Sequence, residues 1–212
     1  MDANFWHDRW QKNEIPFHEK QANPLLVNYF ARLQLEPGSR IFVPLCGKTL
    51  DIHWLLANGH RVVGAELSEL AVQQLFQELG ISPTIQPMNG LIKYSAAGID
   101  VFVGDLFSLT KEQLGPVDAI YDRAALIALP EPVRVKYAAH LKELTASAPQ
   151  LLATLEYDQS TQHGPPFSVD SNEVRRHYGE SYAVTLLASQ ELVGGLRARC
   201  EAMEHVWLLS RV

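Results

Sequence analysis

The fold is decided by the stretch Arg40-Ile41-Phe42-Val43-Pro44-Leu45-Cys46-Gly47-Lys48. Its apolar first half is typical of a buried strand, and the glycine predicts a tight turn that leads into a helix. A second apolar segment, 61–65, predicts another buried strand, and Glu66 follows it, nineteen residues after Gly47. In an open α/β sheet such a unit binds an adenosine-type cofactor, because the turn lets the backbone approach the ligand and the acid accepts hydrogen bonds from the ribose hydroxyls.

The turn itself narrows the choice of cofactor. Dinucleotide-binding proteins usually carry three glycines there, whereas this turn has only Gly47. S-adenosylmethionine has no pyrophosphate that needs a glycine-rich cradle, so the turn favours this cofactor over a nicotinamide dinucleotide. A nicotinamide-dependent oxidoreductase is the alternative that fits the spacing of Glu66, but the chain lacks the GxGxxG turn of that class.

Length and composition indicate one ordinary globular domain. The 212 residues are 47% hydrophobic and 20% charged, which is enough to bury a core without disulfides or metals. No apolar run is long enough to span a membrane, and the acidic, aromatic N-terminus does not resemble a secretory signal. We therefore expect a cytoplasmic protein, and a monomer, since no pattern indicates an obligate interface.

Charge and cysteine content bear on partners and on the compartment. The net charge of −6 disfavours nonspecific binding to nucleic acid. The two cysteines, Cys46 and Cys200, lie far apart without CxxC spacing, which suits a reducing compartment and argues against a bound metal. A thiol on a strand-to-helix turn, such as that of Cys46, can become a nucleophile, but a buried inert cysteine is the commoner case.

Beyond residue 36, strands and helices alternate, which predicts a doubly wound, mostly parallel α/β sheet. The expected strands are 40–43, 61–65, 99–103, 117–121, 151–155, 182–188 and 205–210. The expected helices are 4–12, a segment that begins at Asn23-Pro24, 51–57, 69–79, 131–144 and 170–178. The last two strands lack a helix between them and are expected to pair antiparallel at the sheet edge, an ending typical of class I methyltransferases. The prediction is a single domain over 1–212, with an N-terminal helical cover (1–35) and a seven-stranded, Rossmann-like core (36–212).

Polar side chains follow several of these strands, at the edge where parallel strands place a ligand site. Glu66 ends one strand, Asp105 follows another, and Asp122 and Arg123 follow a third. Each has a structural alternative. Glu66 would then be a solvated residue at the end of its strand, and Asp105 would cap a short helix. Arg123 would form an ion pair with Asp122.

The chain carries a set of motifs in a specific order, which covers nearly its whole length. They are Trp10, Phe17-His18, Val43-Pro44-Leu45-Cys46-Gly47-Lys48, Val62-Val63-Gly64-Ala65-Glu66-Leu67-Ser68-Glu69, Tyr121-Asp122-Arg123-Ala124-Ala125-Leu126, and Leu155-Glu156-Tyr157-Asp158 with Gly164-Pro165-Pro166-Phe167. No single motif is enough to assign a family, but the combination resembles the thiopurine S-methyltransferase family in its bacterial form. The turn at 44–48 and the segment 121–126 are the most specific parts of this resemblance.

The resemblance implies a class I fold, S-adenosyl-L-methionine as methyl donor, and methylation of aromatic or heterocyclic thiols such as thiopurines. Bacterial members are also linked to methylation of selenium and tellurium compounds, so a small chalcogen substrate is a second expectation. Carried over to this sequence, the cofactor-binding residues are Trp10, Leu45, Glu66, Asp105, Leu106 and Arg123. Phe17 is implied as a wall of the substrate pocket. A protein that binds S-adenosylmethionine, a thiol or a metalloid without catalysis is the alternative, and turnover distinguishes the two.

The reaction implied by the resemblance is a displacement between a sulfonium cation and a thiolate anion. Its main requirements are alignment and exclusion of water. We expect Arg123 to be the catalytic residue, because a guanidinium in a pocket of low dielectric favours the substrate anion. Asp122 and Asp158 are weaker candidates for handling the proton.

Overall fold

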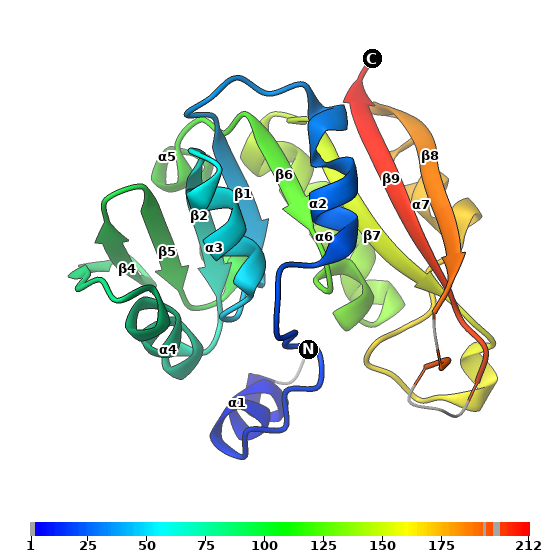
Figure 1. The fold of residues 1–212 in the computed structure, drawn as a ribbon, viewed down its shortest axis with the longest axis horizontal. Coiled ribbons are helices and arrows are strands. Elements are labelled where there is room, and N and C mark those ends of the chain that lie inside the picture. The colour runs from blue at the N-terminus through cyan, green and yellow to red at the C-terminus, as the bar shows by residue number, and fades with distance from the viewer. Residues whose placement is uncertain (1–2, 193, 197–199) are drawn as a thin grey trace.

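The central element is one mixed sheet (Figure 1). The structure, a computed structural model, describes residues 3–192, 194–196 and 200–212. Within this part of the chain the sheet has nine strands in the order β3-β4-β5-β2-β1-β6-β7-β9-β8. In that order the strands are Thr84–Met88, Leu91–Ala96, Ile99–Val103, Arg61–Glu66, Arg40–Pro44, Ala119–Asp122, Gln150–Glu156, Met203–Arg211 and Tyr182–Glu191.

Five neighbouring strands, β5, β2, β1, β6 and β7, run parallel. Strand β9 pairs antiparallel with β7, and β8 pairs antiparallel with β9, which confirms the predicted C-terminal hairpin at the sheet edge. The prediction of seven strands is wrong, because β3 and β4 form a second antiparallel hairpin on the opposite edge. Strand β3 contains Pro87 and is largely exposed, so it has neither the composition nor the alternation of a strand signal.

Helices cover both faces of the sheet (Figure 1). One face carries α2 (Pro24–Tyr29), the 3₁₀ turn Phe30–Leu33, α3 (Leu50–Ala57) and α4 (Glu69–Leu79), and the other carries α5 (Lys111–Leu114), α6 (Glu131–Thr145) and α7 (Ser171–Tyr178). Further 3₁₀ turns lie at Leu106–Ser108, Leu126–Ala128 and Gln159–Thr161. Helix α1 (Ala3–Gln11) lies apart, beyond the carboxyl ends of the parallel strands.

Local signals account for where these helices begin and end. The Asn23 side chain caps α2 by accepting the Leu25 N–H, and Pro24 takes the first helical position. Gly80 ends α4 with a φ of 68°, a conformation that glycine adopts without strain. The Asp170 side chain caps α7 by accepting the Glu173 N–H at 2.7 Å, and the Glu173 carboxylate binds Arg134.

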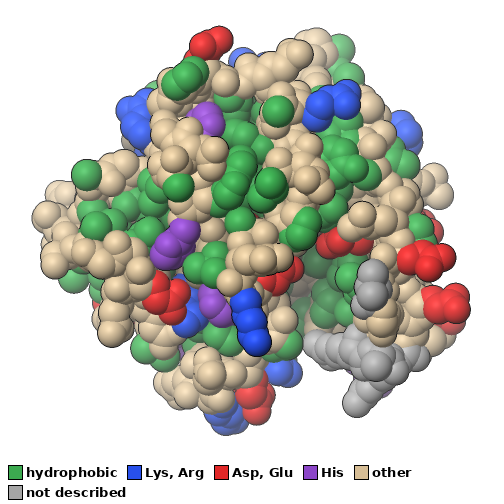
Figure 2. Space-filling view, viewed as in Figure 1, with side chains coloured by type: hydrophobic (Ala, Val, Ile, Leu, Met, Phe, Trp, Pro, Cys, Tyr) green, Lys and Arg blue, Asp and Glu red, His purple; other side chains and the backbone are tan. Residues whose placement is uncertain are grey.

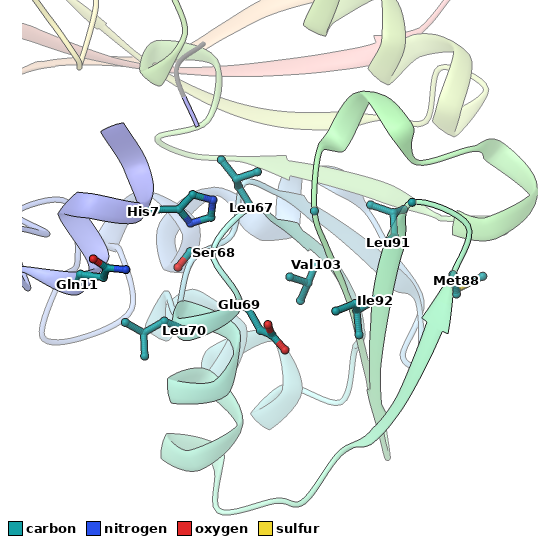
Figure 3. Close-up of a pocket in the computed structure, with 12 residues that line it drawn as sticks. His7, Gln11, Leu67, Ser68, Glu69, Leu70, Met88, Leu91, Ile92 and Val103 are labelled. Carbon is teal, nitrogen blue, oxygen red and sulfur yellow. The ribbon is translucent and has the colours of Figure 1, made fainter. Parts of the chain in front are cut away.

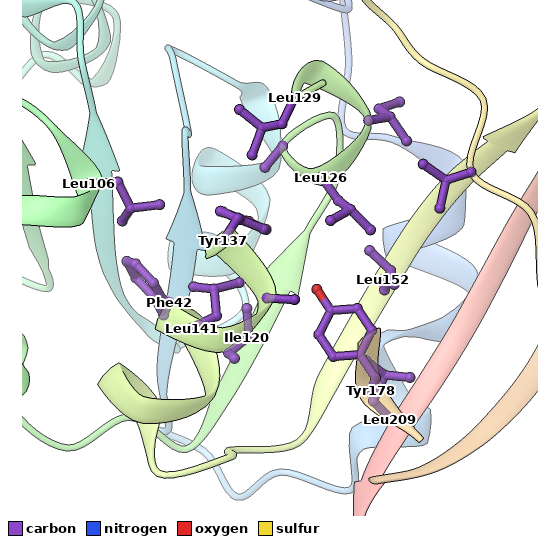
Figure 4. Packing of buried hydrophobic residues seen from close by; sticks show 14 of the residues in the cluster. Phe42, Leu106, Ile120, Leu126, Leu129, Tyr137, Leu141, Leu152, Tyr178 and Leu209 are labelled. Atoms are coloured by element: carbon purple, nitrogen blue, oxygen red, sulfur yellow. The ribbon is translucent and has the colours of Figure 1, made fainter. Parts of the chain in front are cut away.

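The alternation of side chains along β1 divides the core into two layers. Phe42 points to the side of α6 and packs in a cluster with Tyr137 and Leu141 (Figure 4). Ile41 and Val43 point to the opposite side, into a cluster with residues of α2, α3 and α4. A parallel sheet covered on both faces in this way is typical of α/β proteins. Across the described residues, no helix combines the length and apolar character needed to cross a membrane.

Candidate functional site

Most of the predicted site residues meet at a cavity of about 470 Å³ on the carboxyl edge of the parallel strands. Its walls come from the ends of β1, β2, β6 and β7 and from the N-terminal segment up to Glu19. Five of the residues predicted for the site line it together: Trp10, Phe17, Leu45, Glu66 and Arg123. Charged side chains of both signs are intermixed on the face shown in Figure 2. Because these five residues line one cavity, the topology gathers residues that are more than 100 positions apart in sequence, such as Phe17 and Arg123.

The turn after β1 is fixed by the carboxylate of Glu66. Its Oε2 accepts the Gly47 N–H at 2.7 Å and its Oε1 accepts the Ser68 N–H at 2.8 Å. Only 6% of Glu66 is exposed, and this burial raises the pKa of its carboxyl group while the backbone hydrogen bonds oppose that shift. The Glu66 carboxylate, which the spacing predicts as a ribose acceptor, therefore also connects the loop after β1 to the loop after β2.

Trp10 closes the cavity over this turn. The residue is only 4% exposed, and a Cβ atom on Gly47 would lie 2.9 Å from its indole ring. Gly47 also has a φ of 51°, so any side chain at this position would be both strained and obstructed. Trp10 packs edge to face with Phe17, whose ring also contacts Trp6. The N-terminal segment thus forms an aromatic wall of the cavity beside the turn.

Arg123 does not form the ion pair with Asp122 that the sequence allowed. Its Nη1 donates to the Phe17 carbonyl at 3.2 Å, and its Nη2 donates to the carboxylate of Glu19. Asp122 points into the core, where it accepts hydrogen bonds from the Tyr137 hydroxyl and the Leu126 N–H. The chain turns at Ala124, the residue after Arg123, which has a φ of 62°. Glu19 was missed by the sequence analysis, because nothing in the local pattern connects it with a strand end so far along the chain.

Burial raises the pKa of Asp122 to about 6, and its hydrogen bonds from Tyr137 and Leu126 limit the shift. A carboxyl with a raised pKa contributes stability that is full below its unfolded pKa of about 4 and is lost as the pH rises through about 6. We expect Asp122→Asn to remove this loss, so that the unfolding free energies of variant and wild type diverge by about 2–3 kcal/mol between pH 4 and pH 7. Urea titrations at both pH values measure this difference. Parallel pH profiles would contradict it.

A second cavity of about 570 Å³ adjoins the first, and Leu67 lines both. Figure 3 shows His7 and Gln11 of α1 on one side of it, and Ser68 beside the end of β2. Gly104 also lines this cavity, whereas its neighbours Asp105 and Leu106 line neither one. The two cavities therefore meet at Leu67, the residue that follows β2.

Asp105 and Leu106 have structural roles next to that second cavity. The Asp105 side chain caps a 3₁₀ turn by accepting the Phe107 N–H at 3.0 Å, as the structural alternative expected. The Leu106 side chain is buried in the core layer of α6 (Figure 4). Contacts of these two residues with a cofactor stay a prediction.

Two further residues near the turn have their chemistry set by burial. Cys46 is buried, and a Cβ atom on Gly64 would lie 2.8 Å from its sulfur. Burial and the nearby Glu66 carboxylate raise the pKa of the Cys46 thiol well above its usual value, which disfavours a thiolate nucleophile. Burial and the Lys48 ammonium lower the pKa of His18, which lines the first cavity.

Comparison with known proteins identifies close relatives over the whole chain. A family model described as thiopurine S-methyltransferase matches residues 1–211. A thiopurine S-methyltransferase from Xanthobacter autotrophicus is 54% identical over 212 residues, which cover all of both chains. Another from Acinetobacter baylyi is 47% identical over 99% of each chain.

Solved structures share the fold at low sequence identity. A 1,6-didemethyltoxoflavin-N1-methyltransferase from Burkholderia thailandensis, with bound substrate and S-adenosylhomocysteine, superposes with a TM-score of 0.66 at 15% identity, covering 98% of this chain and 87% of that one. A magnesium protoporphyrin IX methyltransferase from Synechocystis, with bound SAH, has a TM-score of 0.62 at 16% identity and covers 97% and 99%. This likeness supports the class I methyltransferase fold and its sheet.

Proposed function

Because the chain belongs to the thiopurine S-methyltransferase family and is an S-adenosylmethionine-dependent methyltransferase, we propose that its acceptor is the sulfur of an aromatic or heterocyclic thiol. The observation that carries this proposal is the first cavity, which the rings of Trp10 and Phe17 line together with the guanidinium of Arg123. Aromatic side chains there suit a flat ring, and Arg123 suits a thiolate. Selenium and tellurium compounds form similarly soft anions, and we include them as second candidates.

The residues present fit S-adenosylmethionine. The turn at Gly47 lines the first cavity, and the buried carboxylate of Glu66 lies beside it. The two adjoining cavities provide separate space for the methionine end and for adenine on either side of Leu67. When bound, the cofactor supplies an activated methyl group on a sulfonium sulfur.

We assign roles to the chain's own residues on this basis. Glu66 binds the ribose hydroxyls, while Leu45 and Trp10 enclose the methionine end and exclude water. Asp105 and Leu106 follow Gly104, which lines the second cavity, and we propose that this segment contacts the adenine. Phe17 packs against the acceptor ring, and Arg123 stabilises the negative charge on the acceptor sulfur.

Methyl transfer from labelled S-adenosylmethionine to 6-mercaptopurine tests the proposal, with selenite- and tellurite-derived acceptors assayed in parallel. Wild type is expected to form labelled product, and Arg123→Ala to lower kcat by about 100-fold, as loss of one donor to a developing anion typically does. Arg176→Ala, which removes an exposed ion pair with Glu131, is the control and should match wild type. Binding of the cofactor without turnover of any acceptor would instead support the non-catalytic alternative.

The organisation of the protein in solution is part of the same proposal. We propose a cytoplasmic monomer with a single domain, in which residues 1–35 cover a core formed by 36–212. The contact of Trp10 with Gly47 supports this division, because it docks the N-terminal segment on the core. Sedimentation of the purified protein at its molecular mass of 23.7 kDa is the expected result.

A further inference from the structure

Glu19 lies in the first cavity and is held there by two partners. One is Arg123, whose Nη2 donates to its Oε1. The other is Asn23, whose Nδ2 donates to both carboxylate oxygens, at 3.1 and 3.2 Å. Asn23 is itself fixed, because its backbone N–H donates to Asp51 at 2.7 Å and its side chain caps α2. The position of the Glu19 carboxylate is therefore defined by the core and not by the loop alone.

The surroundings of Glu19 raise the pKa of its carboxyl group. Burial raises the pKa of its carboxyl group, the Arg123 guanidinium and the Asn23 amide lower it, and the carboxylates of Asp51 and Glu204 raise it further. Burial prevails, so the pKa of Glu19 lies above its usual value. The side chain is still 36% exposed and lines the cavity, which leaves it accessible to a bound ligand. A carboxylate of this kind is suited to accept a proton.

We infer that Glu19 accepts the proton of the acceptor thiol and thereby sets which thiols the enzyme can use. This inference rests on the proposed thiol methylation. It assigns to Glu19 a catalytic role that complements that of Arg123, since the two side chains occupy the same wall of the cavity.

The step is balanced as follows. The S–H bond of the acceptor breaks as an O–H bond forms on Glu19. The sulfur, now anionic, forms a bond to the methyl carbon while the bond from that carbon to the donor sulfur breaks. The proton passes from Glu19 to water after the products leave.

Proton transfer also changes the partner of Arg123. An ionised Glu19 neutralises the guanidinium and competes with an incoming anion. Once Glu19 is protonated, its attraction for Arg123 weakens, and the thiolate formed in the same step can take its place. The pair therefore admits a neutral thiol and then stabilises it as an anion.

Glu19→Gln tests the inference with two acceptors that both carry a benzene ring. 4-Nitrothiophenol is ionised at neutral pH and needs no base, whereas phenylmethanethiol is an alkyl thiol that is mainly protonated, as cysteine is with a pKa of about 8.5. We expect kcat/KM for phenylmethanethiol to fall about 100-fold, and kcat/KM for 4-nitrothiophenol to stay within about threefold of wild type or to rise. Glutamine keeps a carbonyl oxygen for Arg123 and Asn23, so retained turnover of 4-nitrothiophenol also shows that the variant is folded.

Proton release gives a second readout that does not depend on turnover. Phenylmethanethiol is titrated into protein with S-adenosylhomocysteine, in buffers of different ionisation enthalpy. Wild type should release essentially no proton, because Glu19 retains it, while Glu19→Gln should release about one per thiolate bound at Arg123. Glu36→Gln, an exposed carboxylate outside the cavity, should match wild type in both experiments.

Three results would overturn the inference: equal losses for the two thiols, no loss for either, or equal proton release from wild type and Glu19→Gln. Equal losses would mean that Glu19 only positions Arg123. Absence of turnover of both thiols by wild type would be a different outcome, because it would refute the proposed thiol acceptor itself.

Discussion

Replacing Glu66 by alanine is expected to weaken binding of S-adenosylhomocysteine about a thousandfold, since hydrogen bonds to a charged group contribute about 1.5–3 kcal/mol each and two ribose hydroxyls would lose their acceptor. The loss has a second source in the protein itself. The N–H groups of Gly47 and Ser68 both donate to this carboxylate, so the variant leaves two loop donors without their partner. Isothermal titration of the ligand into each protein measures the effect.

Glu66→Gln tests whether the size of the side chain at this position is sufficient for binding. Glutamine keeps the size of the side chain but presents an NH₂ group to one of two backbone donors, so it should bind ligand weakly although it fills the same space. Glu36→Gln should bind like wild type, since Glu36 is exposed and lines neither cavity. Ligand affinity of Glu66→Ala within tenfold of wild type would exclude the ribose role.

The largest expected effect on stability comes from Arg134 on α6. Its guanidinium is buried and donates to both oxygens of Glu173, at 2.5 and 3.0 Å, and to the Leu129 carbonyl at 2.8 Å. His177 contacts the same carboxylate at 3.0 Å. Arg134→Ala should lower the free energy of unfolding by about 3–5 kcal/mol, because it leaves a largely buried carboxylate without its main partner. Denaturant titration at pH 7 measures this loss.

The pH dependence of that loss follows from Glu173. Burial opposes ionisation of its carboxyl group, but the hydrogen bonds from Arg134 and His177 prevail and lower its pKa. The stabilisation is therefore present above the unfolded pKa of about 4.3 and is lost as the pH falls through the lower folded value. Arg176→Ala provides the control on α7, since its exposed ion pair with Glu131 should contribute less than about 1 kcal/mol. Equal losses from the two variants would show that burial of the Arg134 pair has no energetic consequence.

The sequence determined the parts of this protein that depend on local pattern. Buried strands such as β1 and β2 have continuous apolar runs, and caps such as Asn23 and Gly80 define helix ends through contacts within a few residues. The spacing between Gly47 and Glu66 also survives into the structure, because one turn, one helix and one strand are all that separates them. Signals of this kind are contained in short windows, so they can be read without knowing the topology.

The tertiary structure alone decided which distant groups meet. Arg123 lies beside Asp122 in sequence, yet it pairs with Glu19, because successive side chains at the end of a strand point to opposite sides and Asp122 points into the core. The hairpin of β3 and β4 likewise forms because an existing edge at β5 offers free backbone groups, and not because its exposed, proline-containing sequence favours a strand. Burial, which raises the pKa of both Glu19 and Asp122, arises only when the sheet and its two helical layers have assembled.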